Sequence, residues 1–353
     1  MAKTLKVGVV GVGGIARLHM PGWEQSPHAE VVAGCDTDAK ILENWGKQFS
    51  IKRLTRQYDD LLRDPQIDII DVCTPSRYHM PLAVAALEAG KHVICEKPLA
   101  VSPDEVRQMI RARDRSGKML MTAQHLRFHE STQALRAEIC NGALGKIYYG
   151  RAWWLRRAGF PGRSSFWMKQ HSGGGACLDL GVHMLDLALW LMDNPQPISV
   201  TGVSKSELAA IPGAFSIWGK SKVPEGADVE EFAAAFVRFD NGASLSLEVS
   251  WLLHHDTPDD DRQVTLYGVN GGARWPACKL FQTNTTTSQL YTTQLEVTRD
   301  SVSPHALECM EFARAIIEGA PSPVPAEQSL QVIAILDAIY QSEYSGREIR
   351  LGS

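Results

Sequence analysis

The chain has 353 residues, 44% hydrophobic and 22% charged, and a prior of about 150 residues per domain predicts two domains. Lys and Arg total 36 and Asp and Glu total 40, so the formal net charge is −4, which argues against a general nucleic-acid binder. The seven cysteines form no C-x-x-C pair, so neither a disulfide framework nor a structural zinc site is expected. No apolar run approaches the roughly 18 residues of a membrane span, and the N-terminus has the wrong flanks for a signal peptide. Composition therefore predicts a cytoplasmic protein with no membrane or nucleic-acid partner.

Short apolar runs alternate with helical segments over the first 125 residues. The runs are Leu5–Val10, Val31–Cys35, Ile67–Cys73, His92–Cys95 and Met119–Thr122, and the helical segments include Lys40–Phe49, Pro81–Ala89 and Pro103–Ser116. Nearly continuous apolar runs suit parallel strands that are covered on both faces. The alternation predicts an α/β domain over residues 1–125 with a doubly wound parallel sheet.

The pattern changes near residue 146, where strand-like segments follow one another with few helices between them. These segments are Lys146–Leu155, Ile198–Lys205, Phe232–Phe239, Ser244–Leu252 and Gln263–Tyr267. Asp240-Asn241-Gly242 is a hairpin turn between two of them. Two helices, roughly His305–Glu318 and Glu327–Tyr344, close the chain and are candidates to pack back on the first domain. We expect residues 126–353 to form an α+β domain with a mostly antiparallel sheet.

The first apolar run leads directly into Gly11-Val12-Gly13-Gly14-Ile15-Ala16, a G-x-G-x-x-A pattern that opens a helix. Gly11 allows the tight turn, and Gly13 lets backbone N–H groups approach a pyrophosphate. A structural glycine turn would look the same, but Asp36 ends the second run 25 residues later. A carboxylate there accepts hydrogen bonds from ribose hydroxyls and repels a 2′-phosphate. The pattern predicts dinucleotide binding and favours NAD over NADP.

Two polar segments follow later strands on the edge where such sheets bind ligands. They are Thr74-Pro75-Ser76-Arg77-Tyr78-His79 and Glu96-Lys97-Pro98. The second could be a solvated charged turn before a proline. Because it follows an apolar strand on the expected cofactor side, we favour a functional placement.

The segment Asp179–Met192 is apolar nearly all round, which predicts a buried helix. Its polar residues Asp179, His183 and Asp186 share one stripe, and burying an unpaired polar group costs roughly 2 kcal/mol or more. The stripe should therefore face partners or a polar cavity, although a core histidine bonded to a neighbouring Asp is the plain alternative. Gly173-Gly174-Gly175 just upstream allows close backbone approach. Asp179 and His183 suggest zinc, but no third ligand has plausible spacing, so no metal is predicted.

Taken together, these motifs resemble the glucose–fructose oxidoreductase, inositol dehydrogenase and rhizopine catabolism family, abbreviated Gfo/Idh/MocA. The resemblance covers essentially the whole chain. The matching segments, in order, are the glycine loop with His19 after it, Cys73–His79, Cys95–Pro98, Gly174–His183 and Val324–Leu330. It implies a Rossmann domain followed by an open, mostly antiparallel sheet domain, with the active site between them.

The resemblance also implies that Lys97, Asp179 and His183 form the catalytic trio. Oxidising a secondary alcohol requires removal of the hydroxyl proton, which suits a histidine with a reference pKa of about 6.5 better than a lysine near about 10.4. We assign proton transfer to His183, its orientation to Asp179 and polarisation of the reacting oxygen to Lys97, with Lys97 as base the open alternative. The predicted cofactor contacts are Gly11, Gly13, Gly14, Ile15, Ala16, Asp36, Thr74, Pro75, His79, Glu96, Lys97, Gln124 and Trp167.

Predicted substrate contacts include the trio together with Arg127 and Arg163, with Arg157 as an alternative to Arg163. Tryptophans, phenylalanines and arginines alternate between residues 151 and 167, a pattern that also occurs in single-strand nucleic-acid platforms. The acidic balance and the dinucleotide motif favour a wall of a small polar-substrate pocket instead. Family members often have Arg directly after the tryptophan at position 167, and here Met168 stands there.

The leading hypothesis is an NAD-dependent oxidoreductase that transfers a hydride between nicotinamide and a secondary hydroxyl of a monosaccharide, sugar derivative or inositol. One alternative is an NAD-dependent glycosidase that uses transient oxidation, and another is a non-catalytic dinucleotide sensor. We expect a homo-oligomer, a dimer or tetramer, because an open sheet would otherwise present a large apolar face.

Overall fold

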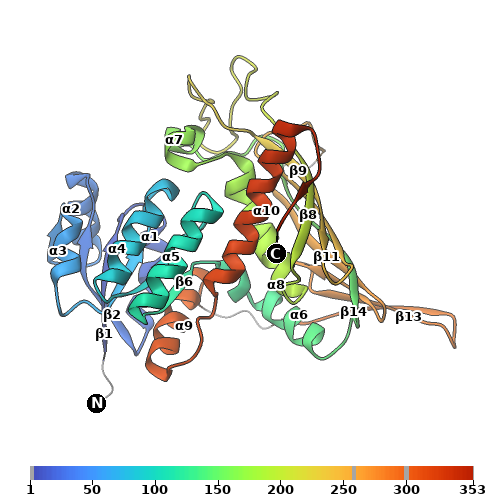
Figure 1. Cartoon of the computed structure of the whole chain (residues 1–353), viewed down its shortest axis with the longest axis horizontal. Coiled ribbons are helices and arrows are strands. Elements are labelled where there is room, and N and C mark those ends of the chain that lie inside the picture. Colours follow the sequence, from blue (N-terminus) through green and yellow to red (C-terminus); the bar gives the residue numbers. More distant parts are fainter. Residues whose placement is uncertain (1–3, 257–259, 298–301, 353) are drawn as a thin grey trace. The chain divides into compact units, whose positions relative to one another are not determined.

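The computed structural model describes residues 4–256, 260–297 and 302–352 and divides into two compact units (Figure 1). The first unit comprises Met1–Phe128 and Ser301–Leu330, and the second comprises His129–Asp300 and Gln331–Ser353. The first division falls three residues after the boundary expected at residue 125. In addition, residues 301–330, which include the first C-terminal helix, group with the first unit.

The first unit contains a six-stranded sheet with helices between its strands. Its elements are β1 (Leu5–Val10), α1 (Ala16–Gln25), β2 (Ala29–Cys35), α2 (Ala39–Gln48), β3 (Arg53–Thr55), α3 (Tyr58–Arg63), β4 (Ile69–Val72), η1 (Ser76–Tyr78), α4 (His79–Glu88), β5 (His92–Cys95), α5 (Pro103–Ser116), β6 (Leu120–Thr122), η2 (His125–Phe128) and α9 (Pro304–Glu318). All strand pairs are parallel, in the order β3-β2-β1-β4-β5-β6. This is the doubly wound Rossmann order, and the chain reverses direction across the sheet between β1 and β4.

The core of the first unit explains why α9 belongs to it. Met20 and Trp23 of α1 share one buried hydrophobic cluster with Cys309 and Phe312 of α9. Gly22 lies against the backbone of α9, since a Cβ there would be 2.3 Å from the carbonyl oxygen of Ala306. The backbones of the two helices therefore approach each other closely at Gly22.

The second unit is built around a nine-stranded sheet. Its elements are α6 (Glu130–Cys140), β7 (Ile147–Arg156), η3 (Ser164–Trp167), α7 (Lys169–Ser172), η4 (Cys177–Gly181), α8 (Val182–Leu191), β8 (Pro197–Lys205), β9 (Phe232–Phe239), β10 (Ser244–Ser250), β11 (Asp260–Gly268), β12 (Gly272–Trp275), β13 (Lys279–Asn284), β14 (Gln289–Gln294) and β15 (Ile349–Arg350). The helix α10 (Ala326–Ser345) begins in the first unit and continues in the second.

The strand order of this sheet is β14-β13-β12-β11-β7-β10-β9-β8-β15, and β7 with β10 is its parallel pair among otherwise antiparallel pairings. The predicted hairpin at Asp240-Asn241-Gly242 joins β9 to β10, with Gly242 at a φ of +84°. The predicted fold class, a parallel Rossmann sheet plus a mostly antiparallel sheet, is confirmed.

The apolar helix of the second unit differs from its prediction at its start. Cys177–Gly181 forms a π-helical turn, and regular α-helix follows in α8. The stretch Lys169–Leu191 has the length and mean hydropathy, 1.3, of a membrane span, although none was expected from the sequence. However, 89% of its apolar window is buried inside the structure, as in the core helix of a folded domain. The π-turn carries Asp179 and precedes His183, and such turns occur frequently at functional sites.

Candidate active site

The glycine loop has the backbone geometry of an anion-binding turn. Gly11 has a φ of +82°, and a Cβ there would lie 2.8 Å from the backbone of Cys73 and from Thr74. The helix α1 starts at Ala16, where its N-cap Ile15 makes no side-chain cap bond and the first turn has no acidic residue. The first N–H groups of α1 therefore have no side-chain cap, and the positive end of the helix dipole fits a pyrophosphate.

Asp36 is held beside this loop at the end of β2. Its Oδ2 accepts a hydrogen bond from the Val12 N–H at 3.0 Å, and its Oδ1 accepts one from the Asp38 N–H at 2.9 Å. The carboxylate is thus fixed where the fold presents the ribose end of a dinucleotide. The structure also brings a positively charged side chain next to Asp36 that sequence reasoning missed. The exposed Arg56 donates from Nε to the carbonyl of Thr37, the next residue, at 3.1 Å.

Replacing Asp36 by serine is expected to raise the ratio of NADP to NAD turnover by about 10²-fold. The change removes charge-assisted hydrogen bonds worth about 1.5–3 kcal/mol and removes repulsion of a 2′-phosphate, while Arg56 remains to attract it. Steady-state kcat/KM with each coenzyme measures the ratio. The double variant D36S/R56A should lose most of the gain in NADP use, and a gain that persists without Arg56 would contradict this account.

The segments after β4 and β5 are tied to each other by His79, whose ring is buried. Its Nδ1 lies 2.7 Å from the Pro98 carbonyl oxygen and its Nε2 lies 2.8 Å from the Thr74 carbonyl oxygen. Burial lowers the pKa of His79, so the ring is neutral and donates to one of the two carbonyls. His79, predicted to contact the cofactor, therefore fixes the two loops. Pro75 is exposed, and the Thr74 hydroxyl is a buried oxygen without a partner among the described residues.

Glu96 and Lys97 follow β5, and their side chains have different surroundings. Glu96 is 5% exposed, with Oε1 3.0 Å from His19 Nε2 and Oε2 accepting from the Lys97 N–H at 3.0 Å. Both carboxyl oxygens are therefore engaged inside the unit, which makes Glu96 a structural neighbour of Lys97. Lys97 is half-buried, and the Lys97–Pro98 peptide bond is cis.

Gln124 and Arg127 follow β6 on the same edge of the sheet. The Gln124 side chain is 1% exposed, and neither its amide nitrogen nor its amide oxygen has a partner among the described residues. A buried, unsatisfied amide costs free energy unless a ligand completes it, which fits a cofactor contact. Arg127, predicted to bind substrate, is buried, and its Nη1 donates to Gln328 Oε1 at 2.6 Å.

In the second unit, Asp179 and His183 lie on the buried helix as predicted. Asp179 Oδ2 accepts a hydrogen bond from Trp251 Nε1 at 3.1 Å, which holds the carboxylate in one orientation. His183 is 5% exposed, and its ring centroid lies 5.6 Å from that of Trp154. Trp154 in turn donates from Nε1 to Asp260 Oδ1 at 2.8 Å. Two tryptophans therefore contact the Asp179 carboxylate and the His183 ring.

Glu230 is a residue of this site that sequence reasoning missed. Its Oε1 accepts from the N–H groups of Gly175 and Cys177, each at 2.9 Å, and from the Tyr340 hydroxyl at 2.9 Å. The side chain thus caps the helix that carries Asp179. Burial raises the pKa of Glu230, and these hydrogen bonds oppose that shift. No local pattern identifies Glu230, because it lies 55 residues from Gly175 in the sequence.

The aromatic segment after β7 divides between core and surface. Trp167 is 1% exposed and packs against Phe160 and Trp251, each at a centroid distance of 4.9 Å. Its ring fills the core, and the indole Nε1 is left without a partner among the described residues. Arg163 and Arg157, by contrast, are exposed.

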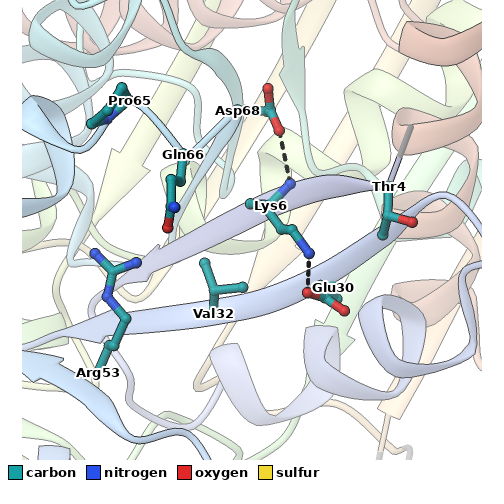
Figure 2. A pocket seen from close by; sticks show the side chains of 8 residues that line it. All are labelled: Thr4, Lys6, Glu30, Val32, Arg53, Pro65, Gln66 and Asp68. Carbon is teal, nitrogen blue, oxygen red and sulfur yellow. Dashed lines mark hydrogen bonds and ion pairs between the residues drawn. The ribbon is translucent and has the colours of Figure 1, made fainter.

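The predicted cofactor residues of the first unit gather at the carboxyl edge of its sheet, whereas Asp179, His183 and Trp167 belong to the second unit. A depression of 680 Å³ in the first unit lies at the opposite edge, around Lys6, Glu30 and Asp68 (Figure 2). Lys6 pairs there with Glu30, and its N–H donates to Asp68 Oδ2 at 3.0 Å. Because these residues precede or begin their strands, this depression is not the expected dinucleotide site.

Comparison with known proteins finds family matches for both halves of the chain. A family model described as "Oxidoreductase family, NAD-binding Rossmann fold" matches residues 5–124, and the GFO/IDH/MocA C-terminal domain matches residues 132–274. The chain is 31% identical to D-glucoside 3-dehydrogenase from Escherichia coli (strain K12), over 98% of this chain and 97% of that protein. It is 26% identical to D-apiose dehydrogenase from Paraburkholderia graminis, over 99% and 91% of the two proteins. A solved structure of levoglucosan dehydrogenase with NADH and levoglucosan has the same fold, with a TM-score of 0.85, 22% identity and coverage of 99% and 100%.

Proposed function

The chain belongs to the GFO/IDH/MocA oxidoreductase family, and from this premise we propose that it oxidises a ring secondary hydroxyl of a glycoside with NAD as hydride acceptor. The observation that carries the proposal is the conjunction of two sites in one chain. The Gly11 turn with Asp36 fits a dinucleotide, and a buried helix presents Asp179 and His183. Similarity to D-glucoside 3-dehydrogenase over nearly the whole length supports a glycoside as substrate class.

The residues divide the chemistry as follows in this proposal. NAD, when bound, supplies the carbon that takes the hydride. His183 removes the hydroxyl proton, Asp179 orients the imidazole, and Lys97 polarises the reacting oxygen with its ammonium group. Lys97 as the base remains the alternative.

Absorbance at 340 nm tests this proposal with a panel of alkyl glucosides, free monosaccharides and inositols. Accumulating NADH with glycosides supports a glycoside dehydrogenase. Release of free sugar without net NADH would instead indicate an NAD-dependent glycosidase, and binding of NAD without any turnover would indicate a sensor. Fastest turnover with inositols would show that the substrate class is cyclitols and not glycosides.

We also propose that copies of the chain associate through one face of the nine-stranded sheet. Tyr149 and Trp153 of β7 and Tyr267 of β11 project from it, and the two tyrosine rings stack at 5.7 Å. Aromatic side chains of this kind are enriched at protein interfaces. Light scattering after size exclusion should give a dimer or tetramer, and Trp153→Glu should lower the mass. A monomeric wild-type protein would contradict the proposal.

A further inference from the structure

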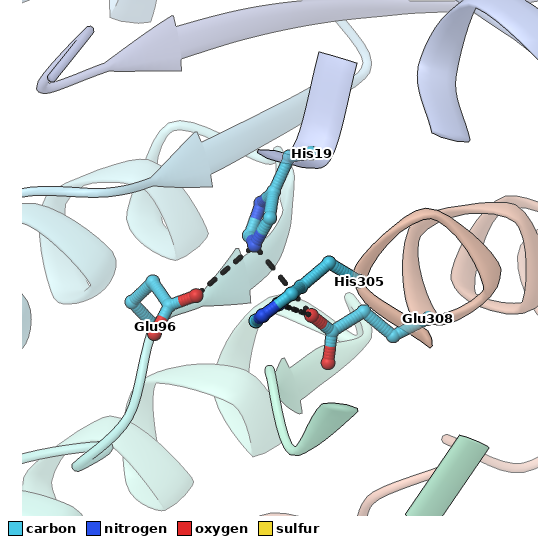
Figure 3. Close-up of side chains that lie close together, drawn as sticks. All are labelled: His19, Glu96, His305 and Glu308. Atoms are coloured by element: carbon cyan, nitrogen blue, oxygen red, sulfur yellow. Dashed lines mark hydrogen bonds and ion pairs between the residues drawn. The ribbon is translucent and has the colours of Figure 1, made fainter. Parts of the chain in front are cut away.

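A chain of buried polar contacts runs through the first unit from α1 to Lys97. His19 of α1 places Nδ1 3.1 Å and 3.2 Å from the two carboxyl oxygens of Asp71 on β4. Its Nε2 lies 3.0 Å from Glu96 Oε1 (Figure 3). Trp23, one turn further along α1, donates from Nε1 to Asp71 Oδ2 at 2.9 Å. The imidazole is therefore fixed at both nitrogens.

Glu96 joins this chain to the main chain of Lys97. While Oε1 faces His19, Oε2 accepts the N–H of Lys97 at 3.0 Å. His19 and Asp71 are fully buried, so water does not compete for these bonds. Burial on its own would lower the pKa of His19, but the charge and hydrogen bond of Asp71 raise it well above the ordinary value. Burial would raise the pKa of Glu96, but the hydrogen bond and charge of His19 lower it to about 2, which favours an ionised carboxylate beside a protonated imidazole.

The helix α9 supports the same cluster from the other side. His19 Nε2 lies 3.6 Å from Glu308 Oε1, and His305 Nδ1 lies 3.2 Å from that oxygen (Figure 3). Burial raises the pKa of Glu308, which favours its protonated form beside Glu96. Because Gly22 also brings the backbones of α1 and α9 together, His19 lies on a helix that packs closely against α9.

We propose that His19 and Glu96 are positioning residues for Lys97: the buried His19–Glu96 pair fixes the position of the Lys97 main chain relative to α1. The helix that carries the glycine loop thereby also sets the backbone from which the lysine ammonium extends. The inference rests on the proposed role of Lys97 in turnover. A misplacement of about 1 Å in such a group can cost about 10²-fold in rate.

The same four side chains, His19, Glu96, His305 and Glu308, lie close enough to hold a metal ion. In the structure, the ligand atoms are already engaged with one another in hydrogen bonds and ion pairs, and His19 is also held by Asp71. These contacts favour a cluster held together by hydrogen bonds and ion pairs over one held together by a metal ion. Elemental analysis of the purified protein tests this. A stoichiometric transition metal that is lost in His19→Asn would overturn the positioning role.

The first test is hydrogen exchange of the Lys97 amide, which needs neither substrate nor turnover. Peptides that cover residues 92–99 should show at least about tenfold faster exchange in Glu96→Ala and in His19→Asn, because the bond to Glu96 Oε2 is lost or loosened. Glu88→Gln is the matched control, since Glu88 is exposed and pairs only with Arg115 among the described residues. Unchanged exchange in both cluster variants would overturn the proposal, as would equal acceleration in the control.

The second test separates positioning from general stability. Glu96→Ala should lower kcat by about 10²-fold when the rate is divided by the concentration of sites that bind NADH. The KM for NAD should stay within about threefold of wild type. Glu96→Gln keeps an acceptor oxygen for the Lys97 N–H, so it should recover part of the loss. If Lys97→Met keeps turnover, the proposed role of Lys97 fails. If Lys97→Met is inactive while Glu96→Ala turns over normally, the dehydrogenase proposal stands and the positioning role is wrong.

Discussion

Lys97→Met is expected to lower kcat by about 10³-fold while NAD binding stays within about threefold of wild type. Methionine keeps the length of the side chain and removes the ammonium that the proposed reaction places on the reacting oxygen. Removing one preorganised electrostatic group costs about 10²–10³-fold in comparable sites. The Gly11 turn and Asp36 do not involve Lys97, so fluorescence titration with NADH should show an intact cofactor site.

Lys47→Met is the matched control for this experiment. Lys47 lies on α2, is exposed, and forms a surface ion pair with Glu43. Exposed pairs of this kind contribute about 0–1 kcal/mol, so kcat should not change. Turnover of Lys97→Met near the wild-type value would contradict the assignment of Lys97 to the reaction.

His183→Asn distinguishes the two candidate bases. Removing a general base costs about 10²–10⁴-fold, and a histidine base gives kcat/KM an acidic limb, because the imidazole must lose its proton before it can act. If His183 is the base, that limb disappears in His183→Asn and persists in the residual activity of Lys97→Met. The reverse pattern would assign the proton transfer to Lys97.

Hydrophobic pattern predicted many of the buried elements but missed others: β12 was not predicted, although its Ala273 and Trp275 are buried. The strand Leu5–Val10 and the helix Pro103–Ser116 have the predicted bounds, because their apolar runs or capping residues are clear. The strand β3 and the hairpin strand β14 were not predicted; β3 is mostly exposed and β14 entirely so. Without a buried face, neither strand has the hydrophobic run or alternation that marks a strand.

In the candidate site, residues with a clear local sequence signal were predicted, and residues that only the folded chain brings together were not. Gly11 and Asp36 were found because a turn and a strand end carry local signals. Asp71 offered a signal that was not used: a charged residue inside the apolar run Ile67–Cys73 requires a buried partner, which is His19. Glu230 gave no such signal, since only the folded chain brings it to Gly175.

Gly175→Ala is expected to destabilise the protein by about 3 kcal/mol or more, lowering Tm by roughly 6–12 °C. An added Cβ would lie 1.9 Å from the carbonyl oxygen of Glu230 and 2.9 Å from its carbon. Both are backbone atoms, so relief requires movement of the segment before β9 or of the turn that carries Asp179. Thermal unfolding measures the loss.

Gly181→Ala is the control within the same helical segment. Its added Cβ would meet the flexible Leu336 Cδ2 at 3.0 Å, and alanine gains up to about 1 kcal/mol over glycine inside a helix. The expected change in Tm is therefore small. Because Gly175 and Glu230 hold the start of the helix, Gly175→Ala should also lower kcat of the folded fraction. A Tm and kcat equal to wild type would show that this close approach fixes neither the fold nor Asp179.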